Sequence, residues 1–157
     1  MDTQEARDLI RDTRFCVLSS ATPDGQPWVS PLFYNYDDSY RLVFESARES
    51  RHAQLIAGNP RVAIVVARLM ARGPIVGVYF ECEAREVPVE GLDEALAVFK
   101  HGPHQKQESQ DRRVSDYLDD KPLRLYEAVP SRTYALNQVR TPEGYLIDER
   151  VEVRLAE

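Results

Sequence analysis

Four polar side chains lie together where a short helix is expected to begin: Arg48, Ser50, Arg51 and His52. Free backbone amides and the positive end of the helix dipole favour an anion at a helix start. Two guanidinium groups and a hydroxyl add further donors, some of them charge-assisted. These residue types therefore indicate a binding site for a phosphate group. A basic helix start that contacts only solvent is the alternative.

The stretch from Phe44 to Pro60 predicts the element that positions these side chains. Ser46 and Glu49 have the spacing of a capping box, in which each side chain binds an amide left free at the helix start. Gly58-Asn59-Pro60 combines a C-terminal glycine with a proline that cannot continue a helix. We expect the end of a strand, a short polar turn and one compact helix.

The chain has 157 residues, of which 43% are hydrophobic and 29% charged, and this balance predicts one globular domain over residues 1–157. Its net charge of −6 argues against binding to nucleic acid or to an anionic membrane, since both require a basic surface. The arginines are unevenly distributed, however. Arginines outnumber acidic residues by five to one between Arg48 and Arg72, which favours a small anionic ligand. Separate solvent-exposed arginines remain the alternative.

Cys16 and Cys82 lie in separate apolar runs. Such cysteines are typical of buried free thiols in a reducing compartment, so we expect a cytoplasmic protein. No cluster of cysteine and histidine has the spacing of metal ligands, and we predict no metal. No apolar run is long enough to cross a bilayer, and the charged N-terminus differs from a secretory signal.

The remaining pattern predicts many short strands and few helices, which favours a β-barrel with peripheral helices. Strands are expected over residues 15–20, 28–36, 40–44, 61–67, 75–87, 123–129, 132–136 and 151–155. The run over 61–67 is continuously apolar, which is typical of a strand buried on both faces. Helices are expected over 3–12 and 91–100. The polar stretch 101–120 predicts a mobile loop with one short helix.

Pro31 lies within the strand expected over residues 28–36, where a proline cannot donate a ladder hydrogen bond. We therefore expect a local break in pairing over residues 29–32, which would leave backbone groups free for a ligand. An ordinary edge strand without a ligand is the alternative.

Several segments fall in a recognisable order along roughly residues 10 to 90. They are Phe15 to Ser20, Asp24 to Phe33, Leu42 to Phe44, and Ser50 to Ala53 with Asn59 to Ala63. In order and spacing these segments resemble the pyridoxamine 5'-phosphate oxidase-like family of FMN-binding split barrels.

The resemblance implies a mainly β (α+β) fold, a six-stranded split β-barrel with peripheral helices. It also implies a homodimer with FMN in the cleft between subunits. By position, the residues implied to hold the FMN phosphate are Ser46, Ser50, Arg51 and His52. Those implied to line the flavin ring with backbone groups are Val29, Ser30, Pro31 and Leu32.

Two departures from the family pattern bear on function. His52 stands where many relatives have lysine, and an unperturbed imidazole is mostly neutral near pH 7. A bound phosphate would favour the charged form, so we expect tighter flavin binding near pH 6 than near pH 8. The C-terminal region lacks the Arg-x-His pair with which the true oxidases hold pyridoxal phosphate, which argues against that activity.

Three functions are compatible with these residues. The first is a flavin-dependent oxidoreductase acting on a small molecule, for which the sequence identifies no catalytic acid or base. The second is a non-catalytic flavin- or haem-binding protein, or a protein that uses a deazaflavin. The third is a structural dimer with an empty cleft. Candidates for the substrate side are Tyr34, Tyr36, Arg68 and Arg72, with packing and surface charge as the alternative, and candidate haem ligands are His101 and His104.

Overall fold

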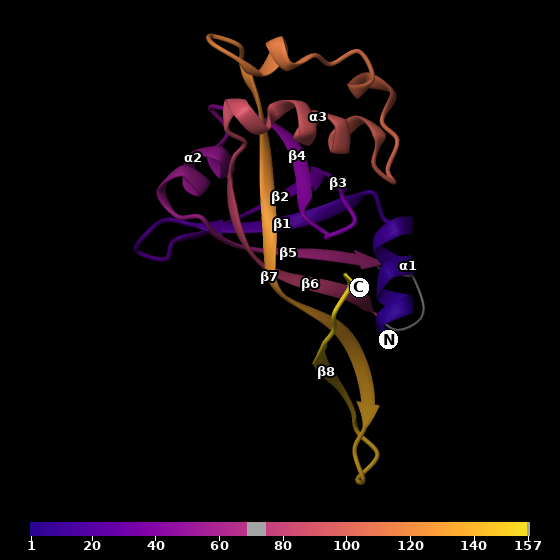
Figure 1. Cartoon of the computed structure of the whole chain (residues 1–157). Helices are drawn as coiled ribbons and strands as arrows, with labels where there is room; N and C mark the ends of the chain where they lie inside the picture. Colours follow the sequence, from indigo (N-terminus) through magenta and orange to yellow (C-terminus); the bar gives the residue numbers. More distant parts are fainter. Residues whose placement is uncertain (69–74, 157) are drawn as a thin grey trace.

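One antiparallel sheet dominates the computed structural model, which describes residues 1–68 and 75–156 (Figure 1). Its strands are β1 (Phe15–Ala21), β2 (Pro27–Phe33), β3 (Asn35–Tyr36), β4 (Leu42–Ala47), β5 (Arg61–Arg68), β6 (Val76–Glu86), β7 (Leu123–Arg140) and β8 (Leu146–Glu152). The helices are α1 (Thr3–Asp12), α2 (Arg51–Gly58) and α3 (Leu92–His101), with 3₁₀ turns η1 (Val89–Gly91), η2 (Gln107–Ser109) and η3 (Val114–Tyr117). The prediction of a mainly β fold with peripheral helices is confirmed.

The sheet runs in the order β2-β1-β5-β6-β7-β4-β3, and β8 pairs with β7. The first and last strands of this path, β2 and β3, are consecutive parts of one segment that is interrupted at Tyr34. The segment pairs with β1 before Tyr34 and with β4 after it. The sheet therefore curls back on itself without a ladder between β2 and β4 in the described residues, which is the split of a split barrel. The described residues form eight strands, where the family resemblance implied six.

Two clusters of buried side chains hold the sheet and helices together. The larger cluster fills the inside of the curled sheet and includes Leu18, Ile64 and Phe80. The smaller one lies between α3 and the β4–β7 pair, with Val43, Phe99 and Leu125 among its members. The face of α3 that the apolar spacing predicted is buried in this second cluster.

β7 is a single strand of 18 residues, where the sequence predicted two strands separated by Pro130 and Ser131. Pro130 pairs with Cys82 at a shift in register, so Ser131 is an extra residue on β7. A bulge tolerates the missing proline N–H, and the Ser131 hydroxyl donates to the carbonyl of Glu81 at 3.0 Å. The pairing therefore continues through a proline that seemed to end it.

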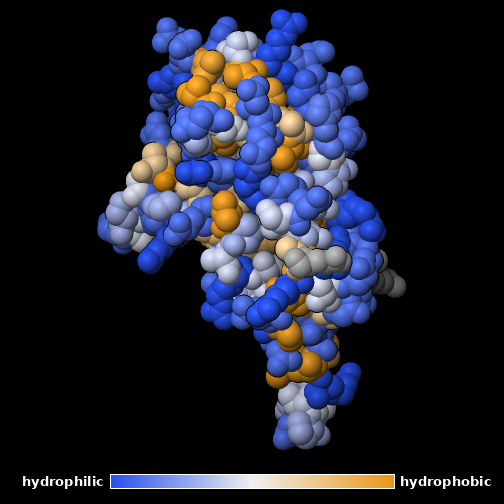
Figure 2. Space-filling model, in the orientation of Figure 1, coloured by the Kyte–Doolittle hydropathy of each residue, from blue (hydrophilic) through white to orange (hydrophobic). Residues whose placement is uncertain are grey.

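β8 begins at Leu146, earlier than the strand predicted over residues 151–155. With the end of β7 it forms a hairpin that projects away from the rest of the sheet (Figure 1). Tyr145, Leu146 and Ile147 are exposed on this hairpin, and apolar residues reach the surface along it (Figure 2).

Residues 101–120 are predicted as a mobile loop with one short helix; in the structure His101 ends α3, η3 is the short helix, and the stretch over residues 102–122 is folded over α3 and β4. The Tyr117 ring is buried, and its hydroxyl donates to Glu45 at 2.8 Å. Arg112 donates to the same carboxylate from two nitrogens, at 2.8 and 3.3 Å. The stretch is held in place by the carboxylate of Glu45 on β4. Its low apolar content gave no indication of these polar contacts.

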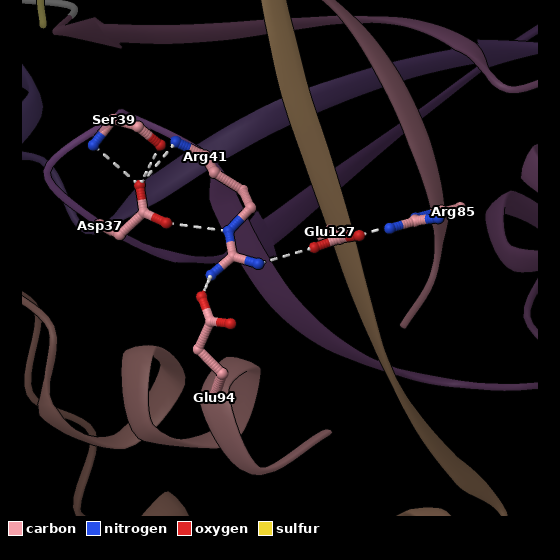
Figure 3. Close-up of polar contacts among 6 residues, drawn as sticks. All are labelled: Asp37, Ser39, Arg41, Arg85, Glu94 and Glu127. Atoms are coloured by element: carbon pink, nitrogen blue, oxygen red, sulfur yellow. Dashed lines mark hydrogen bonds and ion pairs between the residues drawn. The ribbon is translucent and has the colours of Figure 1, made fainter. Parts of the chain in front are cut away.

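A buried carboxylate on β7 joins the strands next to the split. Glu127 is 4% exposed and accepts from Arg41 at 3.0 Å and from Arg85 at 2.7 Å. The guanidinium of Arg41 also binds Asp37 and the more exposed Glu94 (Figure 3). The group connects the β3–β4 turn, β6, β7 and α3 through charged hydrogen bonds.

We expect Glu127→Gln to lower the free energy of unfolding by about 2 kcal/mol, because the largely buried Arg41 loses one of its charged hydrogen bonds. Arg41 keeps those to Asp37 and Glu94. Urea unfolding followed by circular dichroism measures this change. Glu94→Gln is the matched control, since that carboxylate binds the same Arg41 but its side chain is 75% exposed. Its cost is expected below about 1 kcal/mol. Equal losses in the two variants would contradict the role given to burial.

Candidate functional site

The helix that should carry the anion site is present, but it begins later than the capping box predicts. α2 begins at Arg51 with Ser50 as its N-cap, and the Ser50 side chain makes no capping hydrogen bond. Ser46 lies within β4, where it pairs with Arg124 of β7. That ladder keeps Ser46 extended and prevents it from starting a helix, so the predicted capping box is wrong.

His52 is the centre of a polar cluster formed by three serines. Its Nδ1 lies 3.2 Å from the Ser30 hydroxyl oxygen. Its Nε2 lies 2.7 Å from the hydroxyl oxygen of Ser46 and 3.2 Å from that of Ser50. Ser30 belongs to β2 and Ser46 to β4, so the imidazole joins the two strands between which the sheet is split.

Burial lowers the pKa of His52 below its ordinary value of 6.5. Removal from water disfavours the charged imidazolium, because an ion loses its hydration. Hydroxyls surround both ring nitrogens and can donate or accept, so they satisfy a neutral ring. In the free protein the site therefore offers a neutral imidazole.

The guanidinium of Arg51 lies over an aromatic ring at the edge of this cluster. Its central carbon is 4.5 Å from the centre of the Trp28 ring, a cation–π contact. The Trp28 indole N–H also donates to the Ser30 hydroxyl at 3.1 Å. Trp28 is not among the site residues predicted from the sequence. Trp28 lies two residues before Ser30 on the same strand, and residues at that spacing share one face. This spacing was the signal in the sequence that Trp28 lies beside the predicted site.

β2 is an edge strand, and its pairing with β1 continues through Pro31, which lies opposite Val17. The predicted break in pairing is therefore wrong, and of the alternative, an edge strand without a ligand, the edge position is confirmed. Ser30 and Leu32 are buried on the inner side, whereas Val29 and Pro31 are exposed on the outer side. In the described residues β1 is the ladder partner of β2, so half of its backbone groups face the split.

The site therefore combines hydroxyls, an imidazole, a guanidinium and the amide end of α2 beside an open strand edge. Hydroxyls and guanidinium groups are the donors that bind a phosphate monoester, and the helix start adds its partial positive charge. The residues that the structure brings together are Ser30, Ser46, Ser50, Arg51 and His52.

Other candidates from the sequence lie elsewhere. The Tyr34 ring is fully buried, and its hydroxyl donates to the carbonyls of Ile10 and Thr13. Tyr36 stacks between Tyr34 and Tyr40 in the core. Arg48 pairs with Glu49, Arg61 is exposed on β5, and Arg68 faces Asp12 at 3.9 Å. Arg72 lies outside the described residues. The basic stretch is thus not one surface, and these tyrosines act in packing.

The two histidines considered as haem ligands differ in access. His104 is buried, with Nδ1 2.9 Å from the carbonyl oxygen of Tyr34 and Nε2 3.0 Å from that of Ile10. Both ring nitrogens are thereby engaged with the backbone. His101 ends α3 in an exposed position and borders a cavity of about 1110 Å³, which Tyr36 and Tyr40 also line.

Comparison with known proteins gives a family match over most of the chain. The sequence model of the pyridoxamine 5'-phosphate oxidase family matches residues 2–135. A pyridoxine/pyridoxamine 5'-phosphate oxidase from Aeromonas hydrophila is 21% identical over 122 residues, which are 78% of this chain and 52% of the relative. The chain thus spans about half the length of that curated relative.

Solved structures with the same fold include proteins with different ligands. A haem-binding protein from Mycobacterium smegmatis has a TM-score of 0.66 at 19% identity, over 96% of this chain and 57% of the other. A FAD-binding protein from Mesorhizobium loti has a TM-score of 0.62 at 21% identity, over 86% of this chain and 94% of the other. In the described residues, no helix is long and apolar enough to span a membrane.

The lowered pKa of His52 predicts a stability that falls in acid. The unfolded chain takes up a proton as the pH falls through about 6.5, whereas the folded chain resists it until lower pH. The stability that depends on neutral His52 is therefore present above pH 6.5 and is lost progressively below it. Urea unfolding at about pH 7.5 and pH 5.5 should show a smaller acid loss in His52→Gln than in wild type. The exposed-histidine control His101→Gln should keep the wild-type loss, and an unchanged loss in His52→Gln would refute the assignment.

Proposed function

Because the chain belongs to the pyridoxamine 5'-phosphate oxidase family, we propose that it binds FMN between β2 and β4 and serves as a flavin-dependent oxidoreductase. The observation that carries this proposal is the cluster of Ser30, Ser46 and Ser50 hydroxyls around His52 at the start of α2. The substrate proposed is a small molecule. We do not propose the oxidase activity for which the curated relative is named, because this chain spans about half of that protein.

The residues of the site fit a flavin with a terminal phosphate. Arg51, Ser46 and Ser50 would hold the phosphate together with the first amides of α2. The free edge of β2, over residues 29–32, would face the ring with backbone donors and acceptors. The bound flavin supplies the electron-transfer chemistry, and the protein binds, orients and shields it.

His52 gives this binding a pH dependence. Its pKa is lowered in the free protein, so the imidazole there is neutral near pH 7. A phosphate dianion nearby would favour the charged ring and offset the cost of burial. Binding would then take up a proton, which supports the expectation of tighter binding near pH 6 than near pH 8.

A haem protein is the second candidate, supported by exposed His101 beside the large cavity next to α3. His104 does not fit a haem ligand, since both its nitrogens face backbone carbonyls. The haem reading places the ligand away from the serine cluster, so the two candidates predict different sites. A deazaflavin with a phosphate would use the FMN site.

We expect Arg51→Ala to weaken FMN binding about 10- to 100-fold, because a hydrogen bond to a charged group is lost. The measurement is a titration followed by flavin fluorescence and by the visible spectrum, at about pH 6 and pH 8. Arg61→Ala is the matched control, since Arg61 is exposed on β5 and makes no contact with the cluster in the described residues.

Unchanged affinity in Arg51→Ala would remove the phosphate from the start of α2. A wild-type protein that ignores FMN but develops a Soret band with haem would favour the second candidate. In that case His101→Ala, rather than Arg51→Ala, should abolish the band.

We also propose a homodimer that covers the outer face of the sheet and places the flavin at the subunit interface. Residues opposite one another across five strands form one apolar row: Pro31, Val17, Val65, Tyr79 and Tyr134. Beside it Val29 is 61% and Phe15 is 58% exposed. The outer face of an antiparallel sheet is usually polar, so an apolar one indicates a partner. In the single chain β5 alternates between buried and more exposed residues, so the prediction of a strand buried on both faces is wrong for one copy. A second copy would also bury its outer side.

Val17→Asp should weaken dimerisation at least about 100-fold, because it would bury an unpaired carboxylate in the contact. Size-exclusion chromatography with light scattering over a range of concentrations measures this shift. Val89→Asp is the control: Val89 is 67% exposed on η1, away from this face. A wild-type protein that is monomeric at all concentrations, or a Val17→Asp variant that stays dimeric, would overturn the proposal.

A further inference from the structure

We propose that Trp28 is the positioning residue of the phosphate site, acting on Arg51 through its ring and on His52 through its indole N–H. This inference rests on the proposed function for the identity of the ligand. The contacts themselves belong to the free protein. The Trp28 ring contacts Arg51 directly, and its indole N–H is linked to His52 through the Ser30 hydroxyl.

The indole N–H determines the direction of a chain of hydrogen bonds. It is a donor only, so the Ser30 hydroxyl must accept from it. The Ser30 side chain is 8% exposed, and among the described residues His52 Nδ1 is the acceptor within reach of its proton. Ser30 therefore donates to Nδ1. The proton of a neutral imidazole then resides on Nε2, an assignment inferred from the network.

This direction orients donors toward the ligand side. The N–H at Nε2 points to the Ser46 hydroxyl at 2.7 Å, which leaves the proton of Ser46 free to donate onward. Ser50 is the N-cap of α2, and Ser46 of β4 reaches His52 in the first turn of that helix, where an anion is favoured. With the opposite tautomer, Nε2 would accept from these hydroxyls and withdraw a donor from the phosphate.

The ring of Trp28 acts on Arg51 in a second way. An arginine side chain loses rotamer freedom when it binds a ligand, and this loss reduces affinity. Contact with the indole at 4.5 Å already restricts the guanidinium beside the cluster. Trp28 is 41% exposed, so the guanidinium is held at the surface, where a ligand can reach it.

The first experiment needs no ligand. In ¹⁵N-labelled protein, the imidazole signals of His52 should report the Nε2–H tautomer, with His52→Gln used for assignment. Trp28→Phe keeps a ring for Arg51 but removes the N–H, so it should give a mixture of tautomers. Ser30→Ala should do the same. A single, unchanged Nε2–H tautomer in Trp28→Phe would overturn the role of the N–H.

The second experiment is FMN titration of the same protein. We expect Trp28→Ala to bind about tenfold more weakly and Trp28→Phe about threefold more weakly, since phenylalanine retains the cation–π contact. Tyr145→Ala is the control, because Tyr145 is an aromatic residue 71% exposed on the β7–β8 hairpin. Wild-type affinity in Trp28→Ala would overturn the positioning role.

The two experiments separate this inference from the proposed function. A wild-type protein that does not bind FMN contradicts the flavin site, while the tautomer measurement still decides whether Trp28 orients His52. The chain contains one tryptophan, so its fluorescence isolates the contact with Arg51. Acrylamide should quench that emission faster in Arg51→Ala than in Arg61→Ala, and equal quenching would refute the contact.

Discussion

The structure depends on one segment that changes its pairing partner. Residues 27–36 pair with β1 until Phe33 and with β4 from Asn35, with Tyr34 at the change. Because one segment cannot follow both neighbours along its whole length, β2 and β4 diverge and leave an open strand edge. The buried Tyr34 ring fixes the point of change by donating to the carbonyls at the end of α1. The candidate site occupies the resulting gap, where His52 connects the two strands.

Charged and polar groups are placed so that the gap keeps its width. Glu127 of β7 binds Arg85 of β6 and, through Arg41, the turn that leads into β4, and Glu45 of β4 binds Arg112 of the 102–122 stretch. β4 is therefore fixed from both sides before any ligand contact is considered. This matters for Ser46, since a hydrogen bond to His52 requires the strand to stay within a few tenths of an ångström.

Much of this could be predicted from the sequence, and the failures have physical causes. The helix start with Ser50, Arg51 and His52 was visible because local residue types determine it. The spacing of Ser46 and Glu49 predicts a helix cap, but the pairing of Ser46 with Arg124, far away in the sequence, overrides this local signal. β7 was divided in two because a proline looks like an end until the opposite strand provides a bulge. Trp28 escaped attention because its importance comes from two contacts across the fold.

The pairing of β4 has a consequence for the order in which the protein is made. β4 and α2 are synthesised early. β7, which pairs with the whole length of β4, is synthesised only in the last third of the chain. Contacts between distant segments form late, because they require the closure of a large loop. A ribosome-bound chain that ends before Leu123 holds the serine and the histidine without the strand that aligns them. A ligand of this site can therefore stabilise the chain only after β7 has been made, and until then the chain depends on contacts that do not need β7, such as the pairing of β1 with β2 and β5.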